Sequence, residues 1–160
     1  MTILRSVVNR VRKIFGQIGG FFEETQVAQY VTVAGSGAGF TVPDPNAPLP
    51  LSDRHIQDIH APGLIKGSLP VIFFRTTHTE SPSFSAQLNA TRLTQHTFAG
   101  AGPFTWHEII PAGALKAEAN ELTLLVSGDG SVTFSDIVIL YTSNKSTAQI
   151  PFPDQVLDPT

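Results

Sequence analysis

Hydrophobic residues follow a helical period only at the start of the chain. Between residues 2 and 22 they recur at steps of three and four, which places them on one side of a helix. Nine residues form this apolar stripe: Ile3, Leu4, Val7, Val8, Val11, Ile14, Phe15, Ile18 and Phe22. Residues 1–25 are therefore predicted to form an amphipathic helix that needs a surface to pack against, because such a β-branched helix is marginal alone.

Beyond this segment, short apolar runs separated by turn residues predict strands. The predicted strands are 26–33, 64–67, 71–75, 84–88, 91–98, 105–109, 121–127 and 132–141. Their spacing predicts a mainly β protein, an antiparallel sandwich over residues 26–150. Five prolines in residues 43–62 predict a loop or extended arm, within which 53–60 could form a short helical turn. Residues 151–160 are expected to form an extended tail.

The last two predicted strands carry two further expectations. The sequence Gly128-Asp129-Gly130 predicts a tight turn that joins them as a directly paired hairpin. Segment 132–141 is apolar on both faces, with Asp136 as a break or bulge. A strand of this kind is covered on both faces. The sandwich supplies one cover, and the N-terminal helix, the proline-rich arm or a neighbouring chain would supply the other.

Residues 84–141 contain a sequence of turns and strand entries in a recognisable order. These are Gln87-Leu88-Asn89, Pro103-Phe104, Leu115-Lys116 and Asn120-Glu121-Leu122. The order resembles the galactose-binding-like jelly roll, in particular the sugar-binding-type domain of glycoside hydrolase family 2 and related carbohydrate-binding modules. The resemblance implies a jelly-roll sandwich with a lectin-like, carbohydrate-binding role. Asn89 is followed by Ala90, where these domains usually have Gly.

Charge and composition exclude several classes of function. The chain has no Cys, so disulfides, thiolate zinc sites and cysteine nucleophiles are absent. A net charge of −3 gives no general attraction for nucleic acid. Residues 1–24 hold four basic and two acidic residues, so the stripe of residues 2–22 could also lie on an anionic membrane surface. No signal peptide or transmembrane helix is expected, and the compartment is left open.

Candidate chemistry is sparse. No nucleophile elbow or spaced histidine pair occurs, so an enzyme is not expected. Such sandwiches often hold a calcium ion, and hard cations prefer oxygen ligands. The carboxylates of Glu108, Asp129 and Asp136 are the calcium candidates, although Asp129 is also a simple turn residue. No other cofactor is predicted.

Trp106 is the only tryptophan and the first candidate for a sugar site, because aromatic rings stack on sugar faces. Arg75, Asn89, Arg92 and His107 are its candidate polar partners. The alternatives are that Trp106 anchors the core and that Asn89 serves its turn. The sequence thus predicts a non-catalytic, carbohydrate-binding module. The other hypothesis is a structural subunit, a homo-oligomer or part of a larger assembly, in which the helix and the proline-rich arm contact neighbours.

Overall fold

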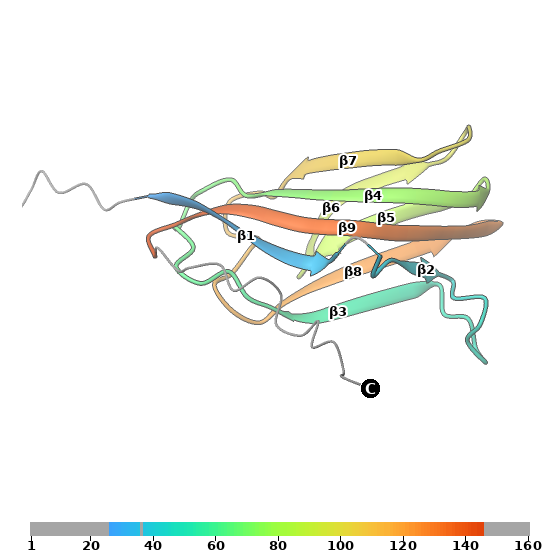
Figure 1. Cartoon of the computed structure of the whole chain (residues 1–160), viewed down its shortest axis with the longest axis horizontal. Coiled ribbons are helices and arrows are strands. Elements are labelled where there is room, and N and C mark those ends of the chain that lie inside the picture. Colours follow the sequence, from blue (N-terminus) through green and yellow to red (C-terminus); the bar gives the residue numbers. More distant parts are fainter. Residues whose placement is uncertain (1–25, 36, 146–160) are drawn as a thin grey trace, which may run out of the picture.

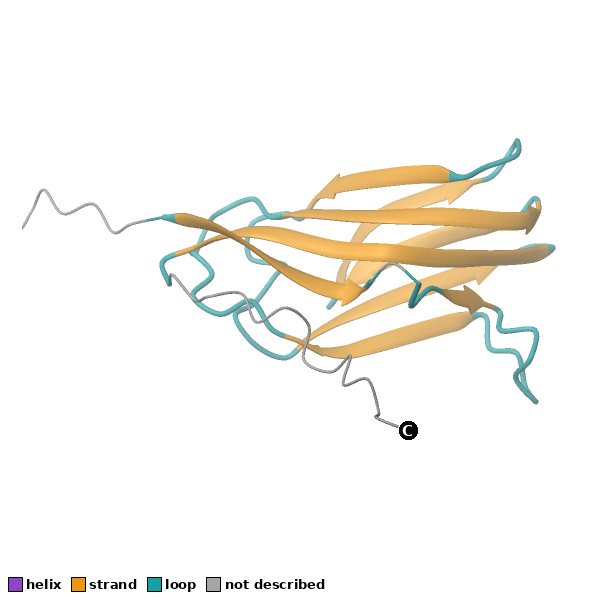
Figure 2. Cartoon of the chain, in the orientation of Figure 1, coloured by secondary structure: helices purple, strands orange, loops and turns teal. Residues whose placement is uncertain are grey.

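The computed structural model describes residues 26–35 and 37–145. The predicted helix and the predicted C-terminal tail lie outside the described residues. Within them the chain forms strands and loops but no helix, and hence none that could cross a membrane (Figures 1 and 2). The strands are β1 Val27–Ala34, β2 Phe40–Val42, β3 Asp53–Ile59, β4 Val71–Glu80, β5 Ser83–Leu88, β6 Thr91–Thr97, β7 Phe104–Ile109, β8 Asn120–Ser127 and β9 Gly130–Ser143.

The strands form two antiparallel sheets packed face to face (Figure 1). One sheet has the order β1-β9-β4-β7, with β2 also paired to β9, and the other has the order β3-β8-β5-β6. The antiparallel pairs are nested: β2 with β9, β3 with β8, β4 with β7 and β5 with β6. A long hairpin of nested pairs wrapped into two sheets is a jelly roll. The predicted jelly-roll sandwich is therefore confirmed.

The predicted hairpin at Gly128-Asp129-Gly130 is wrong. The turn does join β8 to β9, but β8 pairs with β3 and β5, whereas β9 pairs with β1, β2 and β4. The two strands therefore lie in different sheets, and the turn carries the chain from one layer to the other. Glycines with positive φ at both ends of the turn permit this crossing as readily as a hairpin.

Two segments differ from the sequence prediction. Residues 53–59 form strand β3 instead of a loop or helical turn, and only Ile59 in it is buried. The positive φ of Asp58 adds a register shift between Ile56 and Ile59, which breaks the two-residue period that predicts a strand. Residues 64–67 are not a strand; they form a turn with one isolated bridge from Leu64 to Ser143. The proline-rich residues 43–52 do form a loop, as predicted.

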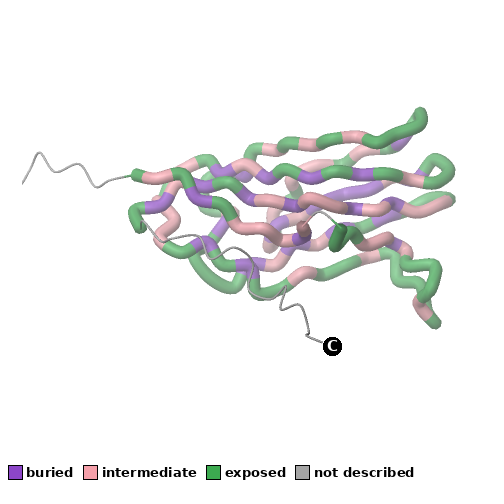
Figure 3. Tube along the Cα trace, in the orientation of Figure 1, coloured by how far each residue is buried: buried purple, intermediate pink, exposed green. Residues whose placement is uncertain are grey.

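The core lies between the two sheets (Figure 3). Its largest fully buried side chains include Phe84, Phe98 and Phe134. Asp136 has a φ of 53° at a register shift in β9, which confirms the predicted bulge. The extra residue changes which side chains face inward, so Phe134 and Ile137 both reach the core while Val138 faces outward. Val138 consequently belongs to the outer face of the five-stranded sheet.

Candidate functional site

The outer face of the four-stranded sheet carries two rows of side chains, all polar except one leucine. Strand register places the members of each row side by side across all four strands. The first row is His55, Thr123, Gln87 and Arg92, and the second is Asp53, Leu125, Ser85 and Gln95. We call these eight residues the polar face. With strands about 4.8 Å apart, each row spans roughly 14 Å.

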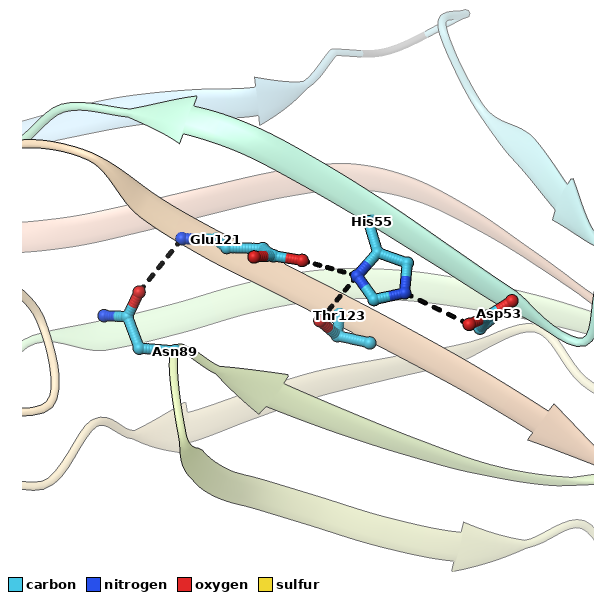
Figure 4. Close-up of polar contacts among 5 residues, drawn as sticks. All are labelled: Asp53, His55, Asn89, Glu121 and Thr123. Atoms are coloured by element: carbon cyan, nitrogen blue, oxygen red, sulfur yellow. Dashed lines mark hydrogen bonds and ion pairs between the residues drawn. The ribbon is translucent and has the colours of Figure 1, made fainter.

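One end of the polar face holds a histidine between two carboxylates (Figure 4). The Nδ1 atom of His55 contacts the Glu121 carboxylate, and its Nε2 atom lies 3.1 Å from the Asp53 carboxylate. The hydrogen bond to Glu121, then that to Asp53, raises the pKa of His55 above its ordinary value of 6.5. The arrangement ties β3 to β8 and makes this end of the face rich in acceptors.

The opposite end of the polar face carries a cation and two amides. Arg92 Nη1 donates a hydrogen bond to Gln95 Oε1 at 3.2 Å, and both side chains are exposed. Gln87 lies beside Arg92 in the first row. A guanidinium and two amides offer both donors and acceptors, so the face can match a ligand that carries several hydroxyl groups.

Trp106 lies away from this face. It belongs to β7 in the other sheet, and its ring packs between the sheets, 5.1 Å from the Phe84 ring and 4.7 Å from the His96 ring between centroids. Its Nε1 atom donates to the buried Thr76 Oγ1 at 2.8 Å. The side chain is half-buried. These contacts match the alternative that Trp106 anchors the core.

The structure does not bring the five predicted ligand residues together. His107 follows Trp106 on β7, and alternate residues of a strand face opposite sides of the sheet, so His107 faces solvent. Arg75 is also exposed on that outer face, whereas Arg92 lies on the outer face of the other sheet. A single site that combines Trp106, Arg75, His107 and Arg92 is therefore not formed.

Asn89 serves the turn between β5 and β6. Its φ of 52° lies in the left-handed region, as the turn hypothesis expects. Its side-chain amide donates to Ala114 O and Asn120 Oδ1, and its Oδ1 atom accepts from the Glu121 backbone N–H at 3.0 Å. All three contacts are internal to the fold, so Asn89 is a structural residue next to the polar face.

The three calcium candidates lie far apart. Gly130, next to Asp129, pairs with Glu80 on β4, whereas Glu108 pairs with Ile72 on the same strand. Eight residues along a strand separate those two positions, which is roughly 26 Å. Asp136 sits in the β9 bulge and accepts a hydrogen bond from Ser135. In the described part of the chain no three His, Asp or Glu side chains gather to hold a metal, so the predicted set does not fit a calcium ion.

A small cavity lies at one end of the sandwich. It has a volume of about 210 Å³ and is lined by residues of the segments 64–70 and 113–117. Lys66 and Lys116 line the cavity, and none of the predicted ligand residues does.

Most of the polar face is not predictable from the sequence. His55 and Asp53 lie in a segment whose prolines predict a loop, so no strand partner can be assigned to them. Gln87 and Thr123 do carry a signal, because each stands between two buried apolar neighbours in a strand. That pattern identifies outward-facing polar positions, but only the strand register places them in one row.

Comparison with known proteins gives similarity at the level of structure. No family model matches the chain, and no curated protein matches it. One similar solved structure is dimeric latent PorU from Porphyromonas gingivalis, with 8% identity, a TM-score of 0.46, and coverage of 74% of this chain. This chain spans only 13% of the PorU chain.

Two carbohydrate-binding modules of the CBM36 type are also similar. The first is CBM36-1 of a multidomain xylanase from the hindgut metagenome of Trinervitermes trinervoides, with 10% identity, a TM-score of 0.42, and coverage of 71% of this chain and 96% of the module. The second was solved with calcium and xylotriose; it has 11% identity, a TM-score of 0.38, and coverage of 72% and 99%. The jelly-roll assignment of this chain rests on its own strand order.

Proposed function

We propose that this protein is a non-catalytic binding module that takes a carbohydrate on the polar face. The observation that carries the proposal is the alignment of His55, Thr123, Gln87 and Arg92 in one row across four strands. Strands of one sheet hold their side chains at fixed spacing, so the row presents a preorganised set of hydrogen-bonding groups. The backbone under the row therefore needs no rearrangement on binding.

The chemistry of the face suits a chain of sugar hydroxyls. Carboxylates at the β3 edge accept hydrogen bonds, the amides of Gln87 and Gln95 both donate and accept, and the Arg92 guanidinium donates several. Leu125 is exposed at the centre of the second row and supplies an apolar contact for a sugar ring. None of the eight polar-face residues is Trp, Tyr or Phe, so hydrogen bonds would carry most of the recognition.

The test is a binding screen of the full chain against soluble neutral and acidic polysaccharides, followed by titration of any ligand found. Arg92→Ala should weaken binding by about tenfold, for a lost charge-assisted hydrogen bond, and Gln87→Ala should weaken it by less, for a lost neutral one. The matched control is Arg75→Ala, which removes an exposed arginine from the other outer face. Equal effects of Arg92→Ala and Arg75→Ala, or no polysaccharide bound at all, would contradict the proposal.

The second candidate function is that of a structural subunit, and the loop between β2 and β3 favours it. Leu49 and Leu51 in this loop are 79% and 66% exposed. Apolar side chains exposed together on a loop are a surface that a neighbouring molecule can cover. If the loop makes such contacts, the solution mass of the full chain will exceed that of a monomer, and Leu49→Ser with Leu51→Ser will reduce it.

A further inference from the structure

Part of the outer face of the five-stranded sheet is apolar, beside the exposed Arg75 and His107. Register aligns one row across four strands there: Tyr30, Leu140, Val71 and Ile109. Tyr30 is 48% exposed, Leu140 40% and Ile109 62%. The row therefore presents four adjacent apolar side chains to the outside of the described sandwich.

The neighbouring row extends this surface. It contains Thr32, Val138, Phe73 and His107 in register, and Phe73 is 39% exposed. We call the six apolar residues of the two rows the apolar face: Tyr30, Val71, Phe73, Ile109, Val138 and Leu140. Contiguous apolar patches on a sheet face mark a surface that another element covers.

We propose that residues 2–22 of the same chain pack on the apolar face through their stripe of nine hydrophobic residues. The chain leads from this segment directly into β1, and Tyr30 of β1 is an end member of the first row. A helix of 21 residues is about 31 Å long. The two rows of the apolar face span roughly 14 Å across four strands, so the segment is long enough to cross them.

The covalent connection favours this occupant over a second copy of the chain. A tethered segment experiences a local concentration of the order of millimolar, without any association in solution. A stable dimer needs about 800 Å² of buried surface on each partner. Six side chains that are already partly covered by their neighbours offer less than such an interface requires. With residues 2–22 packed on the apolar face, β9 would be covered on both sides, by the core on one face and by this segment on the other.

The absence of cysteine in the chain allows a direct crosslinking test in the full-length protein. Val11 lies at the centre of the stripe, so Val11→Cys with Leu140→Cys should form an intrachain disulfide under mild oxidation. Two matched pairs serve as controls. Lys13→Cys with Leu140→Cys moves the first thiol to the polar side of the helix, and Val11→Cys with Gln95→Cys moves the second to the polar face. The first pair should crosslink about tenfold faster than either control, because docking raises its local concentration.

A second measurement does not depend on forming a disulfide. Leu140→Cys alone should react slowly with a soluble thiol reagent, and adding Val11→Asp should speed that reaction about tenfold by releasing the segment. The reactivity of Gln95→Cys should not change with Val11→Asp. Equal crosslinking of the three pairs, disulfide-linked dimers as the main product, or an unchanged Leu140→Cys reactivity would each overturn the proposal.

Discussion

The side-chain amide of Asn89 donates a hydrogen bond to Asn120 Oδ1 at 3.0 Å, which joins the β5–β6 turn to the start of β8. Asn120 is fully buried, and its Nδ2 atom donates to Ile59 O and Lys116 O. Its Oδ1 atom also accepts from the Lys116 backbone N–H at 2.8 Å. The pair thereby holds together the loop before β8, the end of β3 and the turn after β5 at one end of the four-stranded sheet.

Replacement of Asn120 should be strongly destabilising. Asn120→Ala leaves several buried polar groups without partners, and we expect the free energy of unfolding to fall by about 3 kcal/mol. Chemical denaturation of the variant measures this loss. Asn46→Ala, in the exposed β2–β3 loop, is the matched control and should change stability little. A loss no larger than that of the control would contradict the bridging role.

Asn89 both adopts a positive φ and makes side-chain hydrogen bonds, and Asn89→Gly separates these two roles. If the residue served only to adopt its positive φ, glycine would replace it at no cost. Because its side chain also makes three hydrogen bonds, we expect the variant to lose about 2 kcal/mol of stability. A denaturation midpoint equal to that of the original chain would show that Asn89 serves only the conformation of the turn and that its side-chain hydrogen bonds add no stability.

Two strands with a clear two-residue period, β4 and β8, could be predicted from the sequence, whereas β2 and β3 could not. In β8 and in β4 from Val71 to Thr77, buried residues alternate with more exposed ones. Strand β3 is an exposed edge with a bulge, and β2 has only three residues, so neither shows a period. Pairing of β8 with β3 and β5 depends on contacts distant in sequence, which turn residues do not encode.

The candidate site shows the same limit at the level of single residues. Trp106 and His107 are adjacent in a strand, so the two-residue period by itself places them on opposite faces of the sheet. The amino-acid sequence alone therefore suffices to separate these two members of the predicted site. By contrast, His55 lies 32 residues before Gln87 in the chain, although Gln87 and Arg92 face each other across one tight turn. Only the register of four strands brings these residues together.

Trp106 variants should affect stability and leave ligand binding intact. Trp106→Ala removes a half-buried ring from the aromatic cluster, and we expect a loss of about 3 kcal/mol. Trp106→Phe keeps much of the packing but leaves the Thr76 hydroxyl without its partner, which should cost about 1 kcal/mol. Thermal denaturation and polysaccharide titration are measured on the same samples. Lost binding with unchanged stability would instead place the ligand at Trp106.

His55 should make stability depend on pH. Its pKa is raised in the folded state by the hydrogen bonds to Glu121 and Asp53. Since the folded state holds the proton more tightly, the stabilisation is fully present below the ordinary pKa of 6.5 and is lost as the pH rises through the folded pKa. We therefore expect the original chain to have a higher denaturation midpoint than His55→Gln at about pH 5.5. The difference between the two midpoints should be smaller at about pH 9.

The matched control for this pH profile is His107→Gln, which alters an exposed histidine on the other outer face. It is measured at the same pH values, so that the general effect of replacing an exposed histidine can be subtracted. A His55→Gln difference that does not change with pH would show that the two carboxylates do not hold the imidazolium in solution. High salt should shrink the effect, because all three groups are accessible to solvent.

Replacement of Gly130, where the chain crosses between the two sheets, should lower the stability of the fold. It has a φ of 103°, and a Cβ atom there would collide with the backbone carbonyl of Thr79 on the paired strand β4. Gly113 also has a positive φ, 83°, but a Cβ there meets no atom within 4 Å. Both alanine variants therefore bear the conformational cost, and only Gly130→Ala also bears the collision. We expect Gly130→Ala to lose about 2 kcal/mol more stability than Gly113→Ala in chemical denaturation. Equal losses would mean that the end of β4 moves aside easily and that the crossing does not depend on this close approach.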